Sequence, residues 1–242
     1  MKVITIVLCG VILNSCAAFS RINMFTIDDE RRLGRDIAIE IERTVQISSR
    51  ADSISAYVDS LGIAIVNRCN LSKYQFIFKV IESDDVNAFA IPAGGIYINK
   101  GLVDFVDTSD QLVGVIMHEI GHVMRRHGTR ALTRAYGVSC IIELGLNGVN
   151  EDKYYRGVAE VAAMLTGQLT MMKYSRSAEQ ESDHYAVDQM MKAGYEPTAY
   201  ADFIKKLISI KTKNSRVMNI FSTHPEMGDR LDRVNEQIES QE

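Results

Sequence analysis

The sequence predicts a mostly helical α+β fold, with a small antiparallel sheet next to one buried helix. Most of the chain has apolar residues three or four positions apart, which is the period of amphipathic helices. Three short β-rich runs, residues 74–81, 86–91 and 96–99, are interrupted by a Pro-Ala-Gly-Gly turn at 92–95. With 242 residues, 46% hydrophobic and 24% charged, the chain is long enough for one sizeable core.

The first residues predict a secretory signal peptide. Lys2 supplies a positive charge, and the apolar stretch after it is shorter than the ~20 residues that span a bilayer. Leu-Asn-Ser-Cys, ending at Cys16, resembles the lipobox of bacterial lipoproteins. We therefore expect residues 1–16 to be a lipoprotein signal peptide cleaved before Cys16, which would be acylated and hold the protein to a membrane. Ordinary cleavage after Ala18 is the alternative.

Two helices are expected ahead of the strands. Thr26 is a candidate N-cap, because three acidic residues soon follow it, and apolar residues spaced by four extend this helix to Val45. A second helix over residues 54–68 has its apolar residues on one side. After the strands, residues 102–106 predict a short helical step, and residues 107–110 cap the next helix.

That next helix carries the sequence H-E-I-G-H at residues 118–122, within an apolar run. Each helical residue advances ~100°, so His118 and His122 lie one above the other and can point at one metal ion. Glu119 is offset by one residue, where a general base for a metal-activated water is needed. A core helix whose polar residues simply find hydrogen bonds is the alternative, but two histidines and a glutamate on a buried helix favour zinc.

The third metal ligand should come from further along the chain. His127 is nine residues after His118, so it lies half a turn away and should not share the metal, and Gly128 should end the helix. The metzincin pattern is excluded, because it would need Gly at 125 and His at 128. Residues 130–147 and 155–173 are expected to be helical. Cys69 and Cys140 are either a disulfide, which an oxidising compartment permits, or two buried thiols.

A second acidic helix, capped by Ser175 or Ser177, offers the missing ligand. Glu179 and Asp183 are four residues apart and share a face, whereas Glu181 is turned by ~200° from Glu179. Glu179 would complete a His-His-Glu site that leaves one zinc position open. Asp183 would then hydrogen-bond a ligating histidine or the reacting water. A solvated acidic helix start is the alternative, and it leaves the two buried histidines without a partner.

These motifs together resemble the HtpX and CAAX-prenyl-protease family of zinc metalloendopeptidases, which are gluzincins. The family pattern joins H-E-x-x-H to a later E-x-x-A-D, and this chain has Ser182 in place of the alanine. Two further stretches fit, N-A-F-A with P-A-G-G-I-Y-I at 87–98 and T-H-P followed by Arg230. The resemblance is closest to the soluble periplasmic BepA/LoiP-like lipoproteins, and it implies a single zincin-like metallopeptidase domain over residues 25–242.

The resemblance also implies roles for individual residues. It makes Glu179 the third ligand of one Zn²⁺ per chain, in agreement with the helical-face argument. It makes Gly95, Ile96, Tyr97 and Ile98 the edge strand that pairs with extended substrate. His224 would either occupy the fourth zinc position and hold the enzyme latent or donate a hydrogen bond to the oxyanion, the alternative being a helix-cap residue. Arg230 is expected to be a structural ion-pair partner.

The predicted function is zinc-dependent cleavage of unfolded or misfolded envelope proteins, with Glu119, Asp183 and His224 as catalytic residues. The expected location is the periplasm, lipid-anchored to a bacterial membrane that we take to be the outer one. A net charge of −4 without a basic stripe excludes a dedicated nucleic-acid partner. Alternatives are a zinc-binding envelope chaperone or scaffold, a zinc hydrolase acting on another bond, and a membrane-integral prenyl-protein protease.

Overall fold

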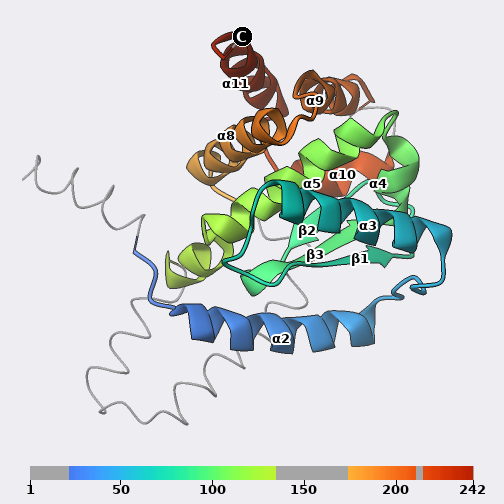
Figure 1. Cartoon of the computed structure of the whole chain (residues 1–242), viewed down its shortest axis with the longest axis vertical. Helices are drawn as coiled ribbons and strands as arrows, with labels where there is room; N and C mark the ends of the chain where they lie inside the picture. Colours follow the sequence, from blue (N-terminus) through green and yellow to red (C-terminus); the bar gives the residue numbers. More distant parts are fainter. Residues whose placement is uncertain (1–21, 135–173, 211–214, 242) are drawn as a thin grey trace, which may run out of the picture.

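The computed structural model describes residues 22–134, 174–210 and 215–241 (Figure 1). The predicted signal peptide with Cys16, most of the predicted helix at 130–147 and all of that at 155–173 lie outside these residues, as does Cys140. The mostly helical α+β fold is confirmed. The elements are α2 (Ile27–Thr44), α3 (Ser53–Arg68), β1 (Ile77–Ile81), β2 (Ala88–Ala90), β3 (Gly95–Asn99), α4 (Lys100–Phe105), α5 (Ser109–Met124), α8 (Arg176–Ala193), α9 (Thr198–Ile210), α10 (Met218–Thr223) and α11 (Met227–Glu239).

The helices begin where the sequence places their capping side chains. Thr26 caps α2 through a capping box in which its hydroxyl and the Asp29 carboxylate each bond the other residue's backbone N–H. Thr108 caps α5, and Ser175 caps α8, the first of the two candidates there. Each cap satisfies backbone N–H groups that have no partner inside the helix. It therefore sets the residue at which the helix begins.

The sheet is mixed, with strand order β1-β3-β2. The predicted antiparallel pairing holds for β2 and β3, whereas β1 pairs with β3 in parallel. The hairpin folds β3 back between β2 and β1, so β3 is hydrogen-bonded on both sides. The prediction that Gly95, Ile96, Tyr97 and Ile98 form an edge strand is therefore wrong, because their backbone groups are already used by β1 and β2.

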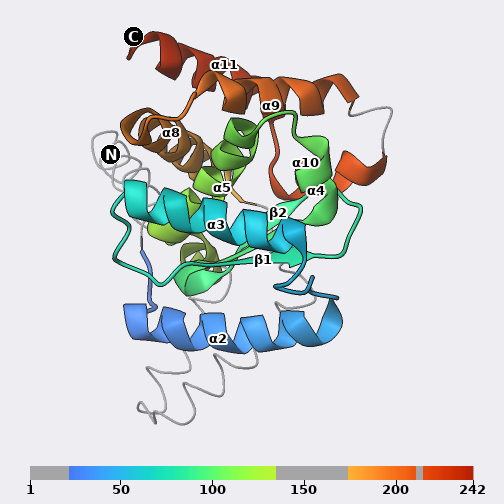
Figure 2. The same cartoon turned by 45° about the vertical axis from the view of Figure 1, so that its right-hand side comes forward.

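Helices cover both faces of this sheet (Figure 2). Along β3, Ile96 and Ile98 point into a core shared with α3, α5, α8 and α9, while Tyr97 points into a second core under α2. Because side chains alternate along β3, this strand contributes to two separate hydrophobic cores, one on each face of the sheet. Helix α5 packs against β2, α8 and α9, so it lies in the middle of the larger core.

Helix α5 ends earlier than predicted. It stops at Met124, with Arg125 as C-cap, and Arg126 has a φ of 59°. This left-handed residue breaks the helix before Gly128, and a new helical segment begins at His127. The break changes the direction in which His127 points relative to His122.

Within the described residues, no helix combines the length and apolar character needed to cross a bilayer. Cys69 carries a free, half-buried thiol.

Candidate metal centre

Two helices carry most of the candidate site, and a glycine lets them approach closely. α5 and α8 make the most extensive contact between elements in the described structure. A Cβ added to Gly121 would lie 3.1 Å from both the Cα and the Oγ of Ser182, closer than ordinary van der Waals contact. The glycine inside H-E-I-G-H therefore allows α8 to bring its acidic residues against the two histidines of α5.

Four buried side chains meet at this contact, each offering one ligand atom, and these atoms lie within 4.8 Å of one another. His118 and His122 come from α5, Glu179 comes from α8, and His224 is the residue that ends α10. The described residues thus bring together the three predicted ligands and His224. The site lies in the main core, so burial excludes most water from it.

Four of the distances between the ligand atoms are close to those in a tetrahedral zinc site. His118 Nε2 lies 3.0 Å from His122 Nε2 and 3.3 Å from His224 Nδ1. Glu179 carboxylate oxygens lie 3.2 Å from His224 Nδ1 and 3.5 Å from His122 Nε2. A tetrahedron with metal–ligand bonds of 2.0–2.1 Å has edges of about 3.3 Å. Three imidazoles and one carboxylate are also a donor set that zinc accepts.

Glu119 lies beside the cluster. Its side chain is buried, its Oε1 is 3.5 Å from His224 Nε2, and its Oε2 has no hydrogen-bond partner among the described residues. Burial raises the pKa of Glu119, because the charged carboxylate loses hydration. An unpartnered buried carboxylate oxygen next to four metal-ligand atoms is suited to exchange a proton with a reacting group.

Asp183 supports His118 from behind. Its Oδ1 accepts a hydrogen bond from His118 Nδ1 at 2.9 Å, and its two oxygens accept hydrogen bonds from Arg230 at 2.7 and 2.8 Å. Burial alone would raise the pKa of Asp183, but the Arg230 guanidinium and His118 outweigh it and hold that pKa well below its usual range. The carboxylate therefore stays charged beside the ring of His118, which is one of the two partners that the sequence suggested for Asp183.

Two further residues complete this support. Arg230 also lies 2.9 Å from a Glu179 oxygen, so from its place on α11 it pairs with both Glu179 and Asp183. The Tyr200 hydroxyl donates to Asp183 Oδ1 at 2.8 Å and lies 3.0 Å from His118 Nδ1. Sequence analysis found Arg230 only as an ion-pair residue and missed Tyr200, because no spacing in the sequence links α9 to α5.

His127 and Glu181 stay off the metal cluster, as predicted, although His127 lies beyond the end of α5 and not on the continuous helix that the prediction assumed. They are nevertheless joined to it, because His127 Nδ1 lies 2.9 Å from His122 Nδ1 and His127 Nε2 lies 3.0 Å from a Glu181 oxygen. Burial lowers the pKa of His127 to about 4, so its ring is neutral near pH 7. Neither contact was expected, since the prediction assumed a continuous helix to Gly128.

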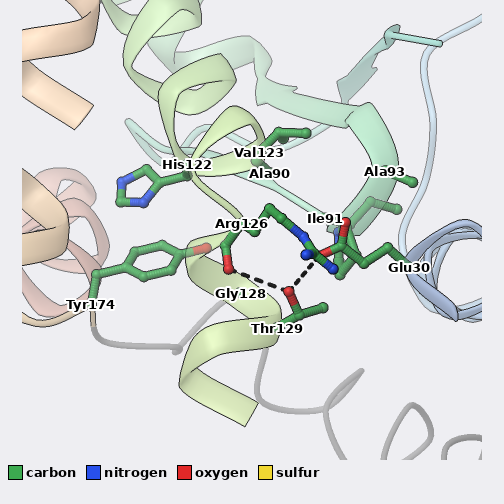
Figure 3. Close-up of a pocket in the computed structure, with 11 residues that line it drawn as sticks. Glu30, Ala90, Ile91, Ala93, His122, Val123, Arg126, Gly128, Thr129 and Tyr174 are labelled. Atoms are coloured by element: carbon green, nitrogen blue, oxygen red, sulfur yellow. Dashed lines mark hydrogen bonds and ion pairs between the residues drawn. The ribbon is translucent and has the colours of Figure 1, made fainter. Parts of the chain in front are cut away.

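A small cavity lies between the end of α5 and the residues after β2 (Figure 3). The ring of Tyr174 stacks on His122, with 3.9 Å between ring centroids. On the opposite wall the buried carboxylate of Glu30 accepts hydrogen bonds from Arg126 and from Tyr74, each at 2.8 Å. These bonds tie α2 to the residues just after α5 and to those ahead of β1.

Comparisons with known proteins agree with this geometry. Residues 52–238 match the family model described as Peptidase family M48. The chain is 30% identical over 191 residues to the beta-barrel assembly-enhancing protease of Escherichia coli K12, covering 76% of this chain and 39% of that protein. It is 23% identical to the metalloprotease YcaL of the same organism, over 88% of this chain and 81% of that protein. It is 26% identical to the metalloprotease LoiP, also of E. coli K12, over 70% of this chain and 65% of that protein.

Proposed function

The chain belongs to peptidase family M48 and is a metallopeptidase, and from this premise we propose that it is a zinc endopeptidase that cleaves extended or unfolded proteins. The observation that carries the proposal is the set of four buried ligand atoms within 4.8 Å of one another, with Glu119 beside it. The chain spans only 39% of the length of the beta-barrel assembly-enhancing protease, so that protein's activity is carried over only as part of this proposal.

In the proposed mechanism His118, His122 and Glu179 would hold a zinc ion. Bound there, it would supply Lewis-acid chemistry for a peptide carbonyl and a water molecule near neutral pH. Glu119 accepts the proton of the attacking water at its unpartnered oxygen and passes it to the leaving nitrogen. Asp183, itself held by Arg230 and Tyr200, keeps the ring of His118 in place.

His224 occupies the position that a catalytic zinc site keeps open for the reaction. Its Nδ1 lies 3.3 Å from His118 Nε2, and its Nε2 lies 3.5 Å from Glu119. We propose that the described arrangement is a latent one, in which His224 must withdraw before substrate enters. His224 is the C-cap of the six-residue helix α10, so a movement of this short segment would be enough to withdraw it.

The site that pairs with substrate backbone is proposed to be β2 instead of β3. The Asn87 carbonyl accepts a hydrogen bond from Asn99 of β3, and the Ile91 N–H donates one to Gly95 of β3. In the antiparallel alternation Ala88 and Ala90 therefore direct their backbone groups away from β3. Ala90 and His122 line the same cavity, which places this edge next to the site. Strand addition here would select extended chains.

Strand addition predicts an alternating response to backbone methylation of a peptide substrate. Only every second substrate N–H can pair with β2, so N-methylation at those positions should raise KM by about 10-fold for each lost hydrogen bond. The intervening positions serve as controls and should change KM little. Equal effects at adjacent positions would contradict pairing with a strand edge.

Removing the metal tests the proposed activity. We expect about one zinc per purified chain, as one tetrahedral site requires, and slow degradation of casein that stops after chelation and returns when zinc is added. Zinc content and casein fragments are measured on the same samples. Cleavage by zinc-free protein at the original rate would contradict the proposal, and zinc binding without any cleavage would favour the chaperone or scaffold alternative.

We propose that the protein acts in protein quality control in the bacterial envelope, held to a membrane by lipid on Cys16. The lipobox-like sequence and the relatives among bacterial proteases support this. Cys16→Ser should shift the protein from the membrane fraction to the soluble periplasmic fraction, since the acyl chains would be lost. Unchanged fractionation would instead favour ordinary cleavage after Ala18.

A further inference from the structure

The ring nitrogen of His122 that faces away from the ligand cluster lies against a second buried histidine. His127 Nδ1 is 2.9 Å from His122 Nδ1, and the other nitrogen of His127 is 3.0 Å from a carboxylate oxygen of Glu181. We propose that His127 and Glu181 are positioning residues, forming a relay that fixes the tautomer and orientation of His122 as a metal ligand. The inference rests on the proposed role of His122 Nε2 in binding zinc.

The hydrogen bonds of the relay can run in only one direction when metal is bound. A metal at His122 Nε2 needs the lone pair of that atom, so the proton of the neutral ring must be on Nδ1. His122 Nδ1–H then donates to His127 Nδ1, which must be unprotonated. The proton of His127 is therefore on Nε2, where it donates to Glu181.

Carboxylates of α8 thus support the two ligating histidines in different ways. His118 donates directly to Asp183, whereas His122 reaches a carboxylate only through His127. The acids of α8 at 179, 181 and 183 would serve as ligand, distant support and direct support, respectively. Partners that orient a ligating histidine in this way typically change metal affinity 10–100-fold when they are lost.

The surroundings hold the relay in one arrangement. Arg130 Nη1 lies 3.1 Å from the Glu181 oxygen that accepts from His127, so this half-exposed carboxylate is kept charged and in place. Ser182 Oγ is 3.5 Å from His127 Nδ1, much further than His122 Nδ1, so His122 is the favoured partner. His127 itself is buried, which excludes water as a substitute.

The early end of α5 makes the relay possible. On an uninterrupted helix His127 would lie about 140° around the axis from His122, too far round for their rings to meet. The left-handed Arg126 breaks the helix between them and directs His127 back to His122. A left-handed conformation is uncommon for a non-glycine residue, and here it stands at the turn that directs His127 to His122.

The relay is tested by measuring zinc affinity, by competition with a chelator, and the visible spectrum of the Co²⁺-loaded protein. His127→Phe keeps a ring but removes the acceptor, and should weaken zinc binding by roughly 10–100-fold and alter the cobalt bands. His127→Asn places an amide oxygen where Nδ1 was, and should recover most of the affinity. Glu181→Ala should weaken binding by roughly 3–10-fold, since His127 remains.

Asp188→Asn is the matched control, because Asp188 is also an ion-paired carboxylate on α8 but pairs with Lys192. It should leave zinc affinity and cobalt spectrum unchanged. Unchanged affinity and spectrum in His127→Phe would overturn the relay, as would equal losses in His127→Phe and His127→Asn. His122→Ala separates failure of the relay from failure of the proposed metal site. If this variant binds zinc as tightly as wild type, the metal site itself is wrong.

Discussion

Replacing Glu119 by glutamine should leave zinc bound and nearly abolish peptide cleavage. Glutamine has the shape of glutamate but cannot accept and return a proton, and general acid–base groups contribute about 10²–10⁴-fold to rate. Metal binding should persist because the ligand atoms belong to His118, His122 and Glu179, with His224 close by. Zinc content and kcat are both measured, kcat with a fluorogenic peptide whose sequence is taken from casein.

The comparison with Asp188→Asn controls for a change of charge on the protein, since that carboxylate pairs with Lys192. The neutral amide in Glu119→Gln also avoids a buried charge, so the variant should fold at least as stably as wild type. Cleavage by Glu119→Gln at the wild-type rate would mean that another group handles the proton, and the proposed mechanism would be wrong.

The parts of the site that sequence could predict are those set by position within one helix. Spacing of four on α5 and on α8 placed His118 over His122 and Glu179 over Asp183, because helical geometry alone decides which side chains share a face. The motifs on these helices also identified the family, and that resemblance is confirmed. The site roles themselves remain predictions until the variants are measured.

What sequence could not supply depends on contacts between elements. The strand runs were recognised, but their order was not, so β3 was taken for an edge strand although it lies between β1 and β2. Tyr200 reaches His118 from α9, eighty-two positions further along the chain. The end of α5 was predicted at Gly128, yet the helix stops at Met124 and Arg126 adopts the left-handed conformation that glycine favours. Packing overrides local preference at each of these places.

Removing the carboxylate of Glu179 should cost the protein its zinc. Glu179→Ala deletes a ligand atom that lies 3.2–3.5 Å from two neighbouring ligand nitrogens, so affinity should fall by more than the roughly 100-fold that marks the loss of an orienting group. Zinc content after purification should drop close to zero. Arg230 keeps its pair with Asp183, so the zinc-free variant should still fold.

Two companion variants give that result its meaning. Glu181→Ala removes the carboxylate of the other glutamate on α8, which points to His127, and should keep its zinc through purification with only weakened affinity. His224→Ala should also keep zinc, because Glu179, the negatively charged ligand, remains together with both histidines of α5. It should cleave faster if His224 holds the site latent. Slower cleavage would assign His224 to stabilising the oxyanion. Zinc loss in Glu181→Ala with zinc retained in Glu179→Ala would reverse the helical-face argument, and a ligand set on the opposite side of α8 would then have to be sought.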